Sequence, residues 1–125
     1  MCRVLIVEDN PLNLELARDL LEAAGFEVIS AKTAKEGLEQ IRLHLPDLVL
    51  LDIALPDMDG LEAVRRIKAD PVLAAIPVVA LSAHAMTRDR DLALKAGCDG
   101  YITKPIDTRK FAPEVSSYST ARACA

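Results

Sequence analysis

An acidic side chain closes a strongly apolar segment in the middle of this sequence. Residues 48–51 form an unbroken apolar run, and Asp52 follows them directly. A second apolar run, residues 4–7, ends in the same way on Glu8 and Asp9. Carboxylates held at the ends of buried strands can bind a metal ion or act as nucleophiles, so these three acids are the first candidates for chemistry.

Two further apolar runs end on a hydroxyl group and on an ammonium group. Ser82 follows residues 78–81, and Lys104 comes shortly after Tyr101 and Ile102. If all four runs are parallel strands of one sheet, then acid, hydroxyl and ammonium groups meet at its carboxyl edge. Phosphoryl transfer requires such a set, because catalysis rests on positioning and on neutralising the phosphoryl oxygens.

Segments with helical periodicity separate these runs. Gly25 is expected to end the first helix, Pro46 the second and Gly97 the fourth. The positions with helical spacing are Leu16, Ala17, Leu20, Leu21 and Ala24 on one stripe of the first helix, Ala34, Leu38, Ile41 and Leu45 on a stripe of the second, Leu61, Val64 and Lys68 with Ile67 in the third, and Ala93 and Ala96 at the end of the fourth. Strand and helix therefore alternate along the chain.

This alternation predicts an α/β fold with five strands and about five helices. Right-handed βαβ crossovers give a flavodoxin-like, doubly wound parallel five-stranded sheet, with strand order 2-1-3-4-5. That order places the first and third strands side by side and brings Glu8 and Asp9 against Asp52. The 125 residues fit one domain, and a composition that is 51% hydrophobic but only 3% aromatic indicates an aliphatic core.

Three carboxylates within a few ångströms must either have raised pKa values or hold a cation. We favour a cation. Oxygen ligands completed by water suit Mg²⁺, whereas the alternative is three acids that point separately into water. In the favoured interpretation Asp52 is the nucleophile. Lys104 pairs with Asp52 beforehand and then with one phosphoryl oxygen, and the Ser82 hydroxyl donates to another.

The motifs that carry these residues resemble the receiver domain of two-component response regulators, over residues 3–111. The matching stretches are residues 7–10, 52–60, 82–86 and 97–105. Within the family, the chain resembles both DivK-type single-domain regulators and the receivers of hybrid histidine kinases, and the sequence does not choose between these.

The resemblance implies that Asp52 accepts a phosphoryl group from a phosphohistidine of a sensor histidine kinase or a histidine phosphotransfer protein. It also implies that Glu8, Asp9 and Asp52 hold Mg²⁺, with Asp9 a direct ligand, and that Ala54 adds its main-chain carbonyl. A downstream protein target is implied as well, because such regulators act by changing partner binding. Formation of a homodimer is left open.

Further roles follow from the same resemblance. Tyr101 corresponds to the switch aromatic, which turns inward when Ser82 is drawn toward the phosphoryl group. Ala83 and Pro105 are assigned to the binding site for the cofactor and the phosphoryl group. A cis peptide before Pro105 would aim the Lys104 ammonium at that site.

Two alternatives belong to other classes of protein. A haloacid-dehalogenase-like phosphatase would need a second aspartate two residues after the nucleophile, where this chain has Ala54. A receiver-like scaffold that is never phosphorylated is disfavoured because the set of reactive groups is complete. The regulator is therefore not expected to be an enzyme beyond supporting its own phosphotransfer and autodephosphorylation. The autodephosphorylation is expected to be slow, because the Ala54 side chain cannot hold a water molecule. His84 is interpreted as a loop residue without a catalytic role.

Charge and hydropathy exclude other classes. A net charge of −4 without a basic stripe argues against direct nucleic-acid binding. No apolar stretch approaches the ~20 residues that span a bilayer, so we expect a soluble, cytoplasmic protein without membrane insertion. The receiver domain is expected over residues 1–118, followed by a frayed tail at 119–125 and no output domain.

Pro113 falls inside the expected last helix. A proline in a helix interior costs roughly 3 kcal/mol, because it removes a hydrogen bond and clashes with the preceding turn. The alternative is a helix that begins at Pro113, where that cost disappears.

Overall fold

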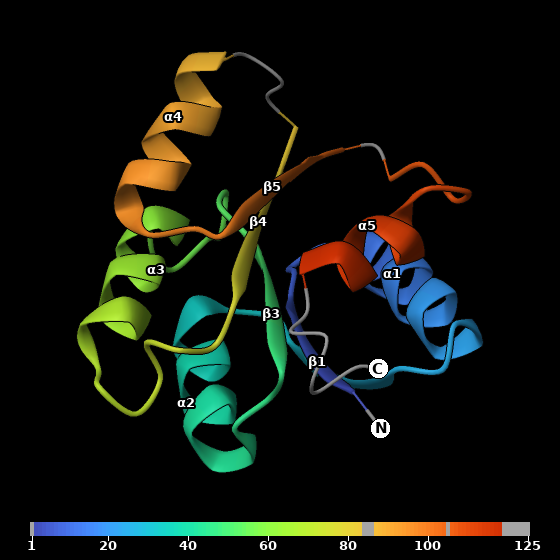
Figure 1. The fold of residues 1–125 in the computed structure, drawn as a ribbon, viewed down its shortest axis with the longest axis horizontal. Helices are drawn as coiled ribbons and strands as arrows, with labels where there is room; N and C mark the ends of the chain where they lie inside the picture. The colour runs from blue at the N-terminus through green and yellow to red at the C-terminus, as the bar shows by residue number, and fades with distance from the viewer. Residues whose placement is uncertain (1, 84–86, 105, 119–125) are drawn as a thin grey trace.

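The computed structural model describes residues 2–83, 87–104 and 106–118. Strands and helices alternate throughout this part of the chain (Figure 1). The elements are β1 (Arg3–Val7), α1 (Pro11–Ala23), β2 (Glu27–Ala31), α2 (Ala34–His44), β3 (Leu48–Asp52), α3 (Gly60–Ala69), β4 (Val78–Ser82), α4 (Thr87–Ala96), β5 (Gly100–Thr103) and α5 (Phe111–Tyr118). The five parallel strands lie in the order β2-β1-β3-β4-β5, so the predicted flavodoxin-like α/β topology is confirmed.

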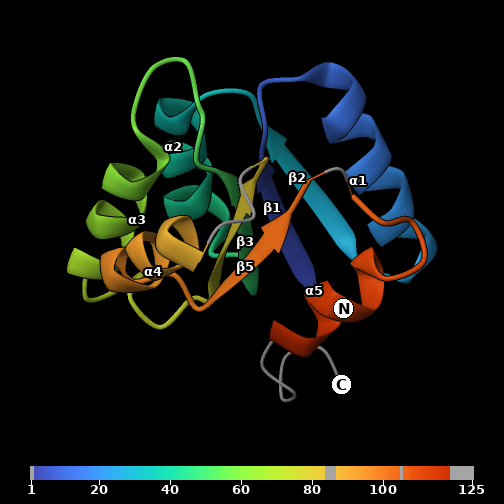
Figure 2. The ribbon, with the colours of Figure 1, turned by 90° about the horizontal axis from the view of Figure 1, so that it is seen from above.

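The helices cover both faces of the sheet. In Figure 2, α1 and α5 lie on one side and α2, α3 and α4 on the other. Each face has its own apolar cluster, one centred on Leu5, Val49 and Val64 and the other on Ile6, Leu50 and Phe111. Every residue of β3 and β4 is buried. Apart from their last residues, Asp52 and Ser82, their sequences are therefore continuous apolar runs, as central parallel strands require.

Local sequence explains where the helices begin and end. Asn10 caps α1 by accepting hydrogen bonds from the main-chain nitrogens of Leu12 and Asn13. Gly25 follows the end of α1 with a φ of 95°, a left-handed conformation that glycine adopts without steric cost. The predicted end of the first helix at Gly25 is therefore confirmed.

Two predicted core faces need correction. The buried residues of α1 are Leu14, Ala17 and Leu21, whereas Leu16 and Ala24 are exposed. The predicted stripe combined two adjacent faces of the helix, and only one of them meets the sheet. Leu45 is also exposed, because α2 ends at His44 and Leu45 leaves the helical path in a left-handed conformation with a φ of 46°.

Pro113 causes no break in the last helix. The helix begins at Phe111, two residues earlier than the proposed start at Pro113, so the proline is its third residue. The nitrogens of the first three helical residues have no partner within the helix, and a proline there removes no helical hydrogen bond.

None of the helices within the described ranges has the length and apolar character that a membrane span requires.

Candidate functional site

Sheet register brings the predicted acids together. β1 and β3 are neighbours with Val7 opposite Leu51, so Glu8 and Asp52 come next at the same edge. Both side chains are buried, each residue being 2% exposed. Two buried acids of this kind contradict the alternative in which the carboxylates point separately into water, although Asp9 itself is exposed.

Lys104 is the cation that faces these acids. Its Nζ atom lies 2.9 Å from Asp52 Oδ2 and 3.2 Å from Glu8 Oε2. The side chain of Lys104 is only 16% exposed, so its charge is little screened by water. The other oxygen of Asp52, Oδ1, accepts a hydrogen bond of 2.9 Å from the main-chain nitrogen of Ala54. Both oxygens of the Asp52 carboxylate are therefore held in place.

The electrostatics of the site are those of a partly compensated acidic cluster. Burial raises the pKa of Glu8, and the nearby charge of Asp52 raises it further, while Lys104 opposes both effects. Burial alone would lower the pKa of Lys104, but hydrogen bonds and charge from Asp52 and Glu8 outweigh it and leave that pKa raised. The cluster thus combines a raised carboxyl pKa with an internal cation.

The acidic groups also fit a metal ion. One carboxylate oxygen from each of Glu8, Asp9 and Asp52 can be chosen such that all three lie within 4.8 Å of one another. A donor set made only of oxygens selects a hard cation, and three carboxylates suit Mg²⁺ completed by water. The acidic cluster is therefore typical of a magnesium site.

The remaining predicted residues surround this cluster. Ser82 ends β4 and is 1% exposed, and its main-chain oxygen accepts a hydrogen bond of 2.6 Å from the main-chain nitrogen of Lys104. Ala83 follows it and is exposed, and so is Ala54. Tyr101 is buried in β5, at 7% exposure, within the core cluster on the α4 side. His84 and Pro105, with the proposed cis peptide, lie outside the described residues.

Three residues with structural roles at this edge were not singled out from the sequence. Asn10 caps α1 directly after the acids, and its main-chain nitrogen donates to Glu8 Oε1 at 3.3 Å. Asp57 caps α2 from a distant loop. Gly60 packs against the end of β3, where a Cβ atom would overlap the Cα atom of Ile53. A cap signal in the sequence could have identified Asn10, but no local pattern indicates the other two contacts.

Comparisons with known proteins agree with this geometry. Residues 4–116 match the family model of the response regulator receiver domain. The chain is 46% identical over 115 residues to the polar-differentiation response regulator DivK of Brucella ovis, covering 92% of this chain and 94% of that protein.

Solved structures give the same result. A putative response regulator from Chloroflexus aurantiacus is similar with a TM-score of 0.89 and 29% identity, covering 94% of this chain and 96% of that one. The receiver domain of a signal transduction histidine kinase from Syntrophus aciditrophicus is similar with a TM-score of 0.85 and 33% identity, over 94% and 89% of the two chains.

Proposed function

Because the chain belongs to the response regulator receiver domains, we propose that it is a switch in which Asp52 accepts a phosphoryl group from a phosphohistidine. The protein is a phosphoacceptor regulator rather than an enzyme, and this excludes the phosphatase alternative. Membership of a two-component system implies a histidine kinase partner, and the donor we propose is a sensor kinase or a histidine phosphotransfer protein. The observation that carries the proposal is the buried Asp52 carboxylate with Lys104 Nζ at 2.9 Å.

The transfer step is a nucleophilic displacement at phosphorus. One carboxylate oxygen of Asp52 forms the new P–O bond, the P–N bond to the donor histidine breaks, and the imidazole leaves with the electron pair of that bond. Lys104 pairs with the Asp52 carboxylate beforehand and then with a phosphoryl oxygen. The Ser82 hydroxyl donates to another phosphoryl oxygen, and Ala83, the exposed residue that follows it, would contact the same group.

Glu8, Asp9 and Asp52, with the main-chain carbonyl of Ala54, would hold Mg²⁺. When bound, the ion neutralises charge on the phosphoryl oxygens. The closeness of the three carboxylates and their oxygen-only chemistry support this assignment.

The output of the switch is a change in partner binding. Phosphorylation adds about −1.5 to −2 charges at this edge, which favours a movement of Ser82 toward the phosphoryl group. Tyr101 lies on the neighbouring strand β5 and would follow by turning further inward. Moving such a switch from 1:99 to 99:1 requires about 5.5 kcal/mol, within the sum of a few charge-assisted hydrogen bonds. We propose residues 1–118 as the receiver unit and a downstream protein as its target.

A direct test uses a small phosphodonor. The protein is incubated with acetyl phosphate and Mg²⁺, and its intact mass is followed beside Asp52→Asn and Lys104→Ala. Asp19→Asn, which removes an exposed acid from α1, is the matched control. We expect the wild type and the control to gain one phosphoryl group only when Mg²⁺ is present, and Asp52→Asn to gain none. A mass gain that persists in Asp52→Asn would place the phosphoryl group on another residue and contradict the proposal, and no gain in the wild type would instead indicate a phosphorylation-independent binding scaffold.

A further inference from the structure

A carboxylate in the loop that follows the phosphoacceptor is bonded to a different helix. Asp57 lies between β3 and α3, yet its Oδ1 atom accepts a hydrogen bond of 2.9 Å from the Ala34 nitrogen and its Oδ2 atom one of 3.0 Å from the Lys35 nitrogen. These two amides are the first of α2. The bonds therefore join the Asp52 loop to a helix more than 20 residues earlier in the chain.

The first amides of α2 need hydrogen-bond acceptors from outside the helix. The first three amides of a helix have no acceptor within it, and those of α2 belong to Ala34, Lys35 and Glu36. Thr33 Oγ1 accepts from the Glu36 nitrogen at 3.1 Å, and Asp57 accepts from the other two. The two hydrogen bonds to Asp57 lower the pKa of its carboxyl group, and the bond from Ala34 has the larger effect. The carboxylate therefore stays charged.

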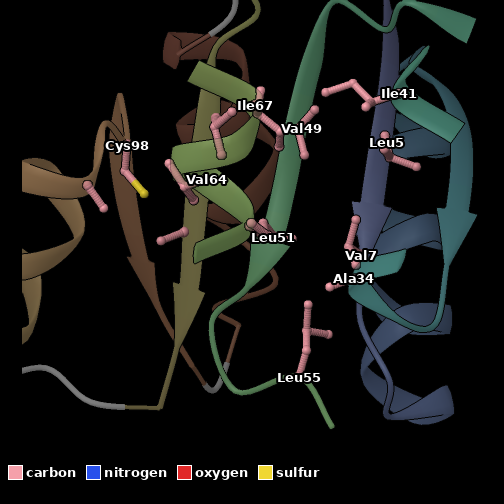
Figure 3. Close-up of a cluster of buried hydrophobic side chains, with 14 of the residues drawn as sticks. Leu5, Val7, Ala34, Ile41, Val49, Leu51, Leu55, Val64, Ile67 and Cys98 are labelled. Carbon is pink, nitrogen blue, oxygen red and sulfur yellow. The ribbon is translucent and has the colours of Figure 1, made fainter. Parts of the chain in front are cut away.

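Several contacts hold the loop between Asp52 and Gly60 in place, and those of Asp57 are among them. At the start of the loop, the Ile53 oxygen accepts from the Gly60 nitrogen at 3.1 Å. In the middle, Leu55 is buried in the same apolar cluster as Ala34, as Figure 3 illustrates. Asp57 adds two charge-assisted hydrogen bonds next to Leu55, so the loop is fixed against α2 by both apolar and polar contacts.

The same segment is also bonded to the acidic cluster. The main-chain nitrogen of Glu8 donates to the Ala31 oxygen at 3.0 Å, and Ala31 is the last residue of β2, just before α2. A continuous path therefore runs from Asp52 through its loop to Asp57, on to the start of α2, and back to Glu8. Lys104 links the two ends of this path directly, because its ammonium group contacts both Glu8 and Asp52.

We propose that Asp57 is a positioning residue, which holds the loop after Asp52 against α2 so that the Ala54 main chain stays in place beside the acidic cluster. The inference rests on the proposed function, since it makes Asp57 a determinant of Mg²⁺ binding and of phosphorylation at Asp52. Asp57 acts through the backbone and through Ala54, and it does not itself contact the phosphoryl group. Residues that orient the ligands of a metal commonly change its affinity by 10-fold to 100-fold when they are mutated.

The experiment compares Asp57→Ala, Asp57→Asn and Thr33→Ala with the wild type. Mg²⁺ affinity is measured by isothermal titration calorimetry, phosphorylation by intact mass with acetyl phosphate, and local opening by amide hydrogen exchange in NMR. We expect Asp57→Ala to weaken Mg²⁺ binding about 10-fold. We also expect faster exchange at Ala54, whose amide donates to Asp52 Oδ1, and slower phosphorylation at limiting Mg²⁺ that saturating Mg²⁺ largely restores.

Thr33→Ala is the matched control, because it removes a cap from the same helix end without touching the loop. It should lower the stability of α2 while leaving Mg²⁺ affinity and Ala54 exchange within about twofold of the wild type, since a lost cap acts locally. Asp57→Asn removes the charge but keeps one acceptor oxygen, and should fall between the wild type and Asp57→Ala.

Each contrary result has a distinct meaning. Equal Mg²⁺ affinity in Asp57→Ala and Thr33→Ala would reduce Asp57 to a helix cap and overturn the inference. Identical behaviour of Asp57→Asn and Asp57→Ala would attribute the whole effect to lost charge and overturn it as well. Failure of the proposed function looks different, because the wild type itself would then neither bind Mg²⁺ nor gain a phosphoryl group on Asp52, and the inference would fall with it.

Discussion

Lys104 contacts Asp52 across the end of an intervening strand. Its Nζ atom lies 2.9 Å from Asp52 Oδ2, although β4 separates β5 from β3 in the sheet. The same nitrogen lies 3.2 Å from Oε2 of Glu8, the residue that follows β1 in the chain. One ammonium group therefore compensates two buried carboxylates that follow different strands, and it competes with any cation that binds the same acids.

This competition gives the first prediction. Lys104→Met should tighten Mg²⁺ binding by at least about 10-fold, because at an effective dielectric constant of ~20 the repulsion between the ammonium group and the ion exceeds the ~1.4 kcal/mol that a factor of ten requires. The same change should slow phosphorylation by acetyl phosphate about 100-fold, because it removes a donor to the phosphoryl oxygens. Calorimetry and intact mass measure the two effects.

Lys32→Met is the control for Lys104→Met, since Lys32 is exposed at the end of β2. It removes the same charge and should leave both quantities within about twofold of the wild type, because exposed charges are screened. Weaker Mg²⁺ binding in Lys104→Met would contradict the competition between the ammonium group and the metal ion.

The raised pKa of Glu8 predicts how Mg²⁺ binding depends on pH. The ion binds the ionised carboxylate, so its affinity should fall as the pH falls through the pKa of Glu8. Because burial and Asp52 place that pKa above the ordinary value of 4.5, the loss should begin at a higher pH than for an exposed glutamate. Calorimetric titrations between neutral pH and pH 5 test this, and Glu8→Gln should weaken binding and flatten the profile.

Stability without Mg²⁺ should show the opposite dependence. A carboxyl group whose pKa is higher in the folded state stabilises the fold while it is protonated, below the unfolded value of 4.5. That contribution is lost as the pH rises through the folded-state pKa of Glu8. The effect of Glu8→Gln on the free energy of unfolding should therefore become more favourable as the pH rises over this range. Urea unfolding followed by circular dichroism measures it, and a constant difference would contradict the assignment.

Much of the fold could be predicted from the sequence because its signals are local. The runs that end at Asp52 and Ser82 are fully buried strands, and the alternation with helices fixes the topology within the rules for parallel sheets. The same topology predicted that Glu8, Asp9 and Asp52 meet, and the three carboxylates do lie together.

Other features could not be predicted, because they depend on contacts between distant segments. Nothing near Asp57 in the sequence indicates that it caps a helix that starts at Ala34. The exposure of Leu16 depends on which face of α1 meets the sheet, and the periodicity of the helix left two adjacent faces open. Lys104 was expected to pair with Asp52, but its second contact with Glu8 follows only from the three-dimensional arrangement.

Cys98 should react slowly with alkylating reagents. The residue is buried and its thiol is free, and burial with the nearby charge of Asp99 raises its pKa to about 11. At pH 8 only about one thiol in 1,000 would be ionised, and the thiolate is the reactive form. Peptide mapping after iodoacetamide treatment should show little modification of Cys98 in the folded protein and rapid modification in denaturant. Equally rapid reaction in both would contradict its burial.

Gly60 provides the last prediction, because it is the first residue of α3 and packs directly behind the phosphoacceptor. A Cβ atom at this position would overlap the Cα atom of Ile53 and lie 2.9 Å from the main-chain oxygen of Asp52. Gly60→Ala should therefore destabilise the protein by about 1–3 kcal/mol, as overpacking does, and should slow phosphorylation because the end of β3 must shift.

Gly25→Ala separates backbone strain from this steric contact. Gly25 has a φ of 95°, and an added Cβ atom would meet nothing within 4 Å. The substitution should cost about 1 kcal/mol through strain alone, and phosphorylation should be unchanged, because the turn after α1 lies away from the acidic edge. Urea unfolding followed by circular dichroism measures stability in a chain that has no tryptophan. If Gly60→Ala is as active and as stable as the wild type, the close packing of α3 against Asp52 does not position the site.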